Sequence, residues 1–281
     1  MDHRAPMPRL ATIPRLLSGA AILAACGDST MPTPPTDATP ILQAVAPSQW
    51  EALAQRRIFF AHMSVGGNMV DGITALLQEH PSLPVRLIRS SEPDTIAGGA
   101  IFHNFVGENG DPSGKTADFA RIVESGTVNR IEIGVQKYCF ADFPLGTEPE
   151  SVFADYERGV EALRRARPDL QIVHVTAPVT AERFSLKDIA RRLLGRQTAR
   201  AQLDKVRRYN ALLLARYGGV DPIFDLAGAE TGVPATPATS QSLNPAYATA
   251  DGAHLNEVGQ RVVGAQFLVF LATLPPTPTA P

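Results

Sequence analysis

The chain has 281 residues with a formal net charge of −2, and 44% of them are hydrophobic and 19% charged. This composition is that of an ordinary globular protein, not of a disordered or collagen-like chain. It also lacks the basic excess of a nucleic-acid-binding surface. With only two cysteines, Cys26 and Cys139, a framework of several disulfides is excluded.

The first 26 residues have the layout of an export signal. Basic residues precede a short apolar run at 16–25, and this run is too short to span a bilayer stably. The tetrapeptide Leu23-Ala24-Ala25-Cys26 resembles the lipobox of bacterial lipoproteins, which implies cleavage before Cys26 and lipidation of that cysteine. We therefore expect an exported protein anchored in the cell envelope, on the periplasmic side of either membrane or at the cell surface. The alternative is an ordinary cleaved secretory signal. Cys139 then has no partner, and we expect a buried thiol.

Proline-rich segments flank one predicted domain. Residues 27–47 combine Thr, Pro, Ala and Asp, with prolines spaced so that helices and strands cannot propagate. Prolines close the other end of the chain in the same way. We therefore expect a signal at 1–26, a tether at 27–47, one folded domain at 48–274 and a tail at 275–281.

Within that domain, apolar β-branched runs alternate with helical patterns, which predicts βαβ units around a parallel sheet. Predicted strands cover residues 57–62, 85–89, 130–136, 171–176 and 222–225. Predicted helices cover 67–79, 116–124, 149–165, a long stretch around 186–217 interrupted at Gly195, and 256–274. The many basic residues of 187–208 predict a solvated helix face, with contact to an anionic polymer or lipid headgroups as the alternative.

Ser64 lies where the first predicted strand turns sharply into the first predicted helix, in the segment His62-Met-Ser-Val-Gly-Gly67. A side chain at the carboxyl end of a parallel strand faces the crevice in which open α/β sheets bind ligands. The amides that open a helix can face developing negative charge. Alone, this turn equally predicts a phosphate loop or a plain helix start. His62 shares the face of Ser64 only if the strand continues that far.

Asp251 and His254 lie three residues apart just before the last predicted helix. At this spacing the carboxylate can accept from one imidazole nitrogen while the other nitrogen faces a serine. Such a pair fixes the histidine tautomer and stabilises the imidazolium that forms when the serine loses its proton. Without a serine, the alternative is a helix-capping aspartate beside a surface histidine.

Taken together, the serine after the first strand and the motif Asp-x-x-His-Leu-Asn-x-x-Gly at 251–259 resemble the first and last blocks of SGNH (GDSL-like) hydrolases. The resemblance implies an α/β fold, a three-layer α/β/α sandwich around a flavodoxin-like sheet of five parallel strands. It implies a catalytic triad of Ser64 as nucleophile, His254 as general base and Asp251 as its orienting partner, with no metal and no cofactor.

The middle blocks depart from the family pattern. Gly-x-Asn-Asp, which helps to form the family's oxyanion hole, is absent after the third predicted strand, where residues 136–142 read Gln-Lys-Tyr-Cys-Phe-Ala-Asp. The oxyanion donor must therefore lie elsewhere, and we consider the Gly107 amide and the Asn109 side chain as candidates. Lys137 is a candidate electrostatic substitute, the alternative being a lysine that snorkels from the strand end. Asp225 and Glu230 resemble loop and cap residues more than catalysts.

These patterns predict a serine hydrolase that acts on carboxylic esters, with small acyl groups on envelope or extracellular polysaccharide as the expected substrates. Acyl transfer to a sugar hydroxyl would use the same acyl-enzyme. A non-catalytic glycan-binding or scaffold lipoprotein is the alternative from another class, favoured by the missing block. A nucleotide or flavin binder is disfavoured, because the first loop lacks Gly-x-Gly-x-x-Gly and Gly-Lys-Ser/Thr.

Overall fold

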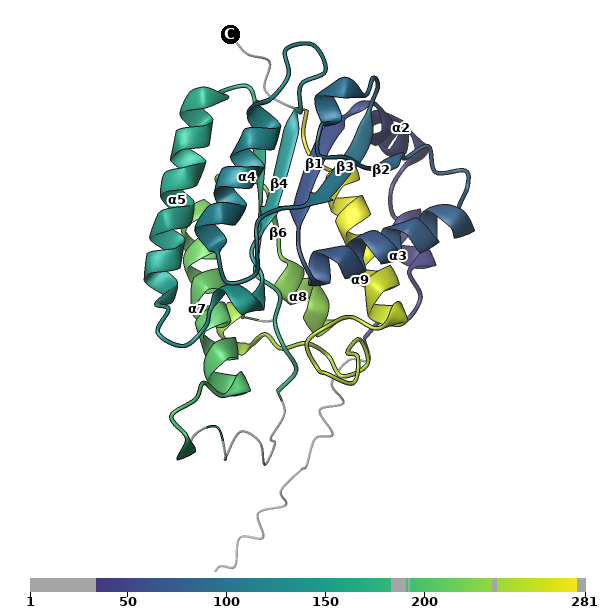
Figure 1. Cartoon of the computed structure of the whole chain (residues 1–281). Helices are drawn as coiled ribbons and strands as arrows, with labels where there is room; N and C mark the ends of the chain where they lie inside the picture. The colour runs from purple at the N-terminus through teal and green to yellow at the C-terminus, as the bar shows by residue number, and fades with distance from the viewer. Residues whose placement is uncertain (1–33, 183–190, 192, 234–236, 277–281) are drawn as a thin grey trace, which may run out of the picture. The chain divides into compact units, whose positions relative to one another are not determined.

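The computed structural model describes residues 34–182, 191, 193–233 and 237–276, and contains a six-stranded parallel sheet in the order β2-β3-β1-β4-β5-β6 (Figure 1). The strands are β1 (Arg57–His62), β2 (Leu87–Arg89), β3 (Ala100–Phe105), β4 (Ile133–Lys137), β5 (Gln171–Val175) and β6 (Ile223–Phe224). Without the edge strand β2, this is the 2-1-3-4-5 order of flavodoxin-like folds. The predicted fold class is confirmed, and the expected count of five strands is corrected to six.

The strand that the sequence did not reveal is β3. Its residues pair in parallel with β1, with Ile101 beside Ile58 and Phe105 beside His62. Two polar residues, His103 and Asn104, interrupt the apolar run of this segment. His103 is nevertheless buried, and its ring hydrogen-bonds the ring of His62, so a partner on the neighbouring strand replaces the water that a loop histidine would contact.

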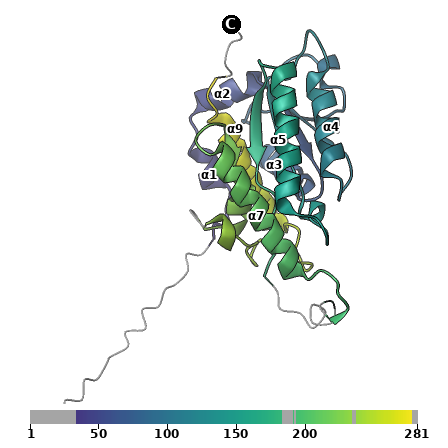
Figure 2. The ribbon, with the colours of Figure 1, turned by 90° about the vertical axis from the view of Figure 1, so that its left-hand side faces the viewer.

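Helices cover both faces of the sheet. They are α1 (Thr39–Gln43), α2 (Pro47–Gln55), α3 (Val65–Glu79), α4 (Pro112–Glu124), α5 (Pro149–Ala166), α7 (Ala199–Tyr217), α8 (Leu226–Thr231) and α9 (Glu257–Ala272). Helices α4 and α5 lie on one side, and α1, α2 and α9 lie on the other (Figure 2). Adjacent residues of β1 show the alternation of a strand buried on both faces: Phe59 packs against Phe119 of α4, while Phe60 packs against Phe267 of α9.

The predicted boundary between tether and domain is wrong, because α1 lies inside the segment 27–47. Ala38, Leu42 and Val45 are buried, and the Tyr247 hydroxyl donates to the Pro35 carbonyl at 2.6 Å. Pro40 occupies the first turn of α1, where a helix does not need an amide donor. The folded unit therefore begins before residue 48. Cys26 and the rest of residues 1–33 lie outside the described residues.

The predicted long helix is represented by α7, which begins at Ala199 after an N-cap at Thr198. Residues 183–190 and 192 lie outside the described residues. Arginines of α7 pair with acids: Arg208 lies 2.6 Å from Glu150 of α5, and Arg207 lies 2.6 Å from Glu182. Arg207 is buried, so this part of the predicted solvated face packs against the protein instead.

Candidate active site

Ser64 has a backbone conformation that sets it apart within the described part of the chain. Its φ of 50° and ψ of −113° make it the one non-glycine residue there with positive φ. Such a conformation costs about 1–3 kcal/mol and persists where the surrounding structure imposes it, often at a functional site. The turn joins the end of β1 to the start of α3, with Ser64 as the N-cap. A strained strand-to-helix turn is how α/β hydrolases expose a nucleophilic serine.

The turn closes only because residue 66 has no side chain. A Cβ on Gly66 would lie 2.4 Å from the Cβ of His62 and 2.9 Å from the Cε of Lys137. Both distances are below any real Cβ contact, so the backbone at Gly66 packs directly onto these two side chains. The sequence signal for this packing is the pair of glycines after Ser64.

The structure brings Ser64, His254 and Asp251 together in one hydrogen-bonded chain. The Ser64 Oγ lies 2.8 Å from His254 Nε2, and His254 Nδ1 lies 2.6 Å from Asp251 Oδ2. The sequence separates the serine and the histidine by 190 positions. Asn68 of α3 holds the two segments together, because its Oδ1 accepts from the Leu255 amide at 3.2 Å.

Asp251 is fixed and ionised by its surroundings. Its Oδ1 accepts hydrogen bonds from the Thr249 hydroxyl at 2.7 Å and from the amides of Ala253 and His254 at 2.7 and 3.1 Å. Partial burial opposes ionisation, but the hydrogen bonds from Thr249, Ala253 and His254 outweigh it and hold the pKa of Asp251 well below its usual range. The carboxylate is therefore negatively charged at neutral pH and can stabilise an imidazolium at His254.

The start of α3 offers amide donors beside the serine. Within the described residues, the Ser64 and Val65 amides have no hydrogen-bond acceptor, whereas the Gly66 and Gly67 amides donate to Met63 and Ser64 carbonyls. The helix is 15 residues long, so its dipole places positive potential at this end. The sequence indicated that the amides opening this helix can face negative charge, but it pointed only to Gly107 and Asn109 as oxyanion candidates. The free amides of Ser64 and Val65 are further candidates.

The structure does not support Gly107 as an oxyanion donor. Its amide donates to Asp118 Oδ2 of α4 at 2.9 Å and is therefore occupied. Asn109 differs, because it is its Oδ1 that accepts from Lys115 Nζ at 3.0 Å, and its donor group Nδ2 stays a candidate. Both partners lie on the helix that follows the loop, and the folding of the loop back onto that helix is not visible in the sequence.

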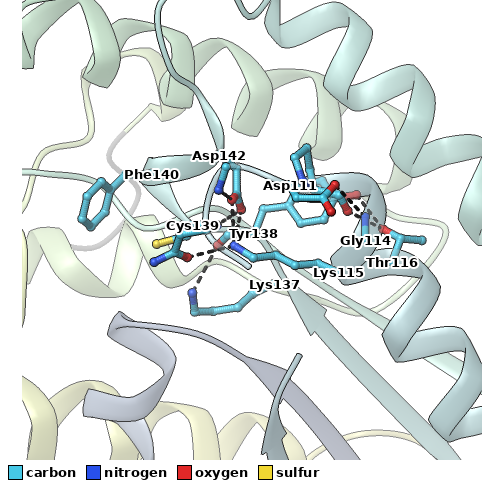
Figure 3. Close-up of polar contacts among 12 residues, drawn as sticks. Asp111, Gly114, Lys115, Thr116, Lys137, Tyr138, Cys139, Phe140 and Asp142 are labelled. Carbon is cyan, nitrogen blue, oxygen red and sulfur yellow. Dashed lines mark hydrogen bonds and ion pairs between the residues drawn. The ribbon is translucent and has the colours of Figure 1, made fainter. Parts of the chain in front are cut away.

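Lys115 and Asp142 form a buried ion pair that sequence analysis did not detect (Figure 3). Their side chains are 1% and 0% exposed and lie 2.7 Å apart. Asp142 also accepts from the amides of Gly110 at 2.8 Å and Cys139 at 2.7 Å. The pair thus ties the loop after β3 to the loop after β4, and these two strands flank β1, which carries the serine.

The loop after β4 also reaches the histidine of the triad. Phe140, which opens the short 3-10 helix η2 (Phe140–Asp142), packs the edge of its ring against His254, with ring centroids 5.9 Å apart. In Figure 3 the Phe140 ring points away from the ion pair. Lys115 and Asp142 therefore fix one side of this loop while Phe140 contacts the catalytic candidate on the other.

His62 and Lys137 lie beneath the serine turn. Strand β1 does persist to His62, but the side chain is buried, and its Nε2 hydrogen-bonds His103 Nδ1 at 3.0 Å. Burial, reinforced by the positive neighbours His103 and Lys137, lowers the pKa of His62 to about 3. Lys137 does not snorkel to solvent: it is buried, and its Nζ donates to the Tyr138 carbonyl at 3.2 Å. Burial lowers the pKa of Lys137.

Three other residues complete the comparison with the sequence. Cys139 is a buried free thiol, as predicted. Asp225 caps α8 by accepting from the Gly228 amide at 3.0 Å, also as predicted. Glu230 is not a cap: it is fully buried in α8, its Oε2 accepts from the Val179 amide at 2.7 Å, and burial raises its pKa to about 8.

Two classes of feature are missing from the described residues. Their histidines, cysteines and acidic residues form no cluster suited to a metal ion. Among the helices that the structure describes, none is both long and apolar enough to cross a bilayer.

No protein-family model matches this chain, and no curated protein matches its sequence. Solved structures resemble it at low identity. A carbohydrate esterase family 3 protein from Talaromyces cellulolyticus is 13% identical, with a TM-score of 0.44 over 75% of this chain and 94% of that one. A member of the lipolytic G-D-S-L family from Veillonella parvula has the same identity, TM-score and coverages. A lipase/acylhydrolase from Enterococcus faecalis is 16% identical, with a TM-score of 0.40 over 76% and 93% of the two chains.

Proposed function

We propose that this protein is a serine hydrolase of carboxylic esters that works through an acyl-enzyme on Ser64. The observation that carries the proposal is the hydrogen-bonded chain from Ser64 through His254 to Asp251, with distances of 2.8 and 2.6 Å. Nucleophile, base and orienting group within hydrogen-bond reach are the geometric signature of an activated serine. The strained conformation of Ser64 and its place at a helix start support the same assignment.

The proposed proton path follows this hydrogen-bonded chain. His254 Nε2 removes the proton from Ser64 Oγ as the oxygen attacks the ester carbonyl carbon, and the carbonyl oxygen becomes negatively charged. The Ser64 and Val65 amides at the start of α3 are placed to stabilise this oxyanion. The imidazolium, held by anionic Asp251, then gives its proton to the leaving alcohol oxygen. Water then attacks the acyl carbon and gives a proton to His254, and His254 passes this proton to Ser64 Oγ as the acid leaves.

The buried Lys137 packs below this turn. Its Cε lies 2.9 Å from the position of a Cβ on Gly66, two residues after the nucleophile. Its Nζ is buried and donates to the Tyr138 carbonyl. We assign it the role of a positioning residue that supports the turn.

The substrate proposal combines the site with the signal-like start of the chain. A lipid anchor on Cys26 would hold the domain at the cell envelope, where small acyl esters on envelope or extracellular polysaccharide are available. The assembled triad argues against a purely glycan-binding scaffold. Hydrolysis and transfer to a sugar hydroxyl share the acyl-enzyme, and they are separated by analysing the product as free acid or as a new ester.

The test is hydrolysis of p-nitrophenyl acetate and butyrate by the chain from residue 27 onwards. Ser64→Ala and His254→Ala are expected to abolish the activity. The matched controls are Ser82→Ala and His80→Ala, which change the same residue types at and beyond the opposite end of α3 and should retain activity. Equal loss in the control variants, or activity that survives Ser64→Ala, would contradict the proposal.

A further inference from the structure

An exposed aromatic ring and an arginine lie at the edge of the sheet that carries Ser64. In the parallel ladders, Phe105 of β3 is in register with His62 of β1, and Arg89 of β2 is in register with His103 of β3. Phe105 and Arg89 thus end their strands at the edge where β1 turns into Ser64. The carboxyl ends of parallel strands are where α/β sheets bind ligands.

Phe105 is held in place although the residue is 47% exposed. The ring packs edge-on against His62, with centroids 4.9 Å apart. It also lies 3.8 Å from the position of a Cβ on Gly67, in the first turn of α3 after Ser64. An aromatic ring that is fixed by the structure and still open to solvent offers contact area at little cost in conformational entropy.

Arg89 places a positive charge over this ring. Its guanidinium carbon lies 5.0 Å from the Phe105 ring centroid, a cation–π contact that orients the planar group. Its one hydrogen bond with a described side chain goes to the neutral Asn104 Oδ1, at 3.5 Å. Within the described residues Arg89 pairs with no carboxylate, whereas Arg164, Arg207 and Arg261 all do. The donors of Arg89 therefore remain available to an anion from outside the chain.

We propose that Arg89 and Phe105 form a subsite that binds a carboxylate-bearing sugar ring next to the ester bond that Ser64 attacks. This inference rests on the proposed function and names the substrate class: esters of acidic carbohydrate. The guanidinium fork matches the geometry of a carboxylate and can bind it through two parallel hydrogen bonds. The exposed part of Phe105 supplies the apolar surface for the ring to which that carboxylate is attached.

The experiment measures binding by calorimetry, using the full chain with Ser64→Ala so that no hydrolysis occurs. The ligands are O-acetylated oligogalacturonate and, as the neutral counterpart, O-acetylated xylo-oligosaccharide. The acidic ligand is expected to bind more tightly, and its affinity should fall as salt is raised. Adding Arg89→Gln should lower the affinity for the acidic ligand about tenfold, which is the effect of losing one charge-assisted hydrogen bond. The affinity for the neutral ligand should fall much less.

Arg86→Gln is the matched control, because Arg86 is an exposed arginine just before the other end of β2 whose Nη1 contacts the Ala97 and Gly99 carbonyls. It should leave the ratio of the two affinities unchanged. The inference is overturned if the acidic ligand has no advantage, or if Arg89→Gln and Arg86→Gln have equal effects. Because binding is measured without turnover, this failure is distinct from an absence of Ser64-dependent hydrolysis of p-nitrophenyl acetate, which overturns the proposed function.

Discussion

Removing the cation of the Lys115–Asp142 pair is expected to destabilise the fold strongly. In Lys115→Met the carboxylate of Asp142, which is 0% exposed, keeps the hydrogen bonds from the Gly110 and Cys139 amides but loses its only ion-pair partner among the described residues. Breaking a buried ion pair from one side costs about 3–5 kcal/mol, because an uncompensated charge stays in the interior. We expect Lys115→Met to lower the free energy of unfolding by this amount.

The prediction is measured by urea unfolding in a double-mutant cycle with Asp142→Asn. The doubly substituted protein carries no buried charge, so its loss of stability should be smaller than the sum of the two single losses, with a coupling of about 2 kcal/mol. Arg121→Met is the control, since it breaks an ion pair on the same helix whose side chains are 67% and 45% exposed. This control should change stability by no more than about 0.5 kcal/mol. Additive losses, or a Lys115→Met effect as small as that of Arg121→Met, would refute the reasoning.

Three further predictions concern the residues around Ser64. Gly66→Ala should cost about 1–3 kcal/mol in thermal unfolding and lower kcat as the turn shifts, because its Cβ would lie 2.4 Å from the Cβ of His62; unchanged kcat and stability would contradict this packing. The pKa of His62 is about 3 in the folded protein and about 6.5 in the unfolded chain. Between about pH 3 and pH 6.5 the unfolded chain therefore binds more protons than the folded protein. Stability should therefore fall as pH drops below about 6.5, by up to about 1.4 kcal/mol per pH unit, and His62→Asn should show a shallower fall in urea titrations at pH 5 to 7. Comparing the two proteins cancels the opposite contribution of Glu230, and parallel curves would refute the assignment. Lys137→Met should lower kcat for p-nitrophenyl acetate about tenfold or more with little change in KM. If the role of Lys137 were purely structural, the substitution would change the free energy of unfolding and leave kcat unchanged.

The sequence was most informative where one local pattern determined the structure. Strand β1 matches its predicted bounds because its apolar run at 58–61 ends at a turn, and that turn located Ser64. The spacing of Asp251 and His254 likewise places a carboxylate beside a ring nitrogen within a single loop. Both features depend on neighbours in the chain.

What the sequence did not reveal depends on contacts between distant segments. Strand β3 was missed because the burial of His103 requires His62 on the neighbouring strand. Gly107 was misassigned because its amide acceptor, Asp118, lies on the following helix. The helix α1 was missed because its prolines suggested a tether, whereas Leu42 packs into the core. Tertiary contacts decide all three, and local propensity does not contain them.

The most direct test of the account is intact-mass spectrometry after treatment with a fluorophosphonate. The activated Ser64 oxygen should displace fluoride and form one covalent adduct per chain, mapped by peptide analysis to the segment that contains Ser64. Asp251→Asn should slow this labelling by a factor on the order of 10³, because His254 loses the partner that fixes its tautomer. An unlabelled protein, or an adduct at another serine that persists in Ser64→Ala, would contradict the catalytic role assigned to this site.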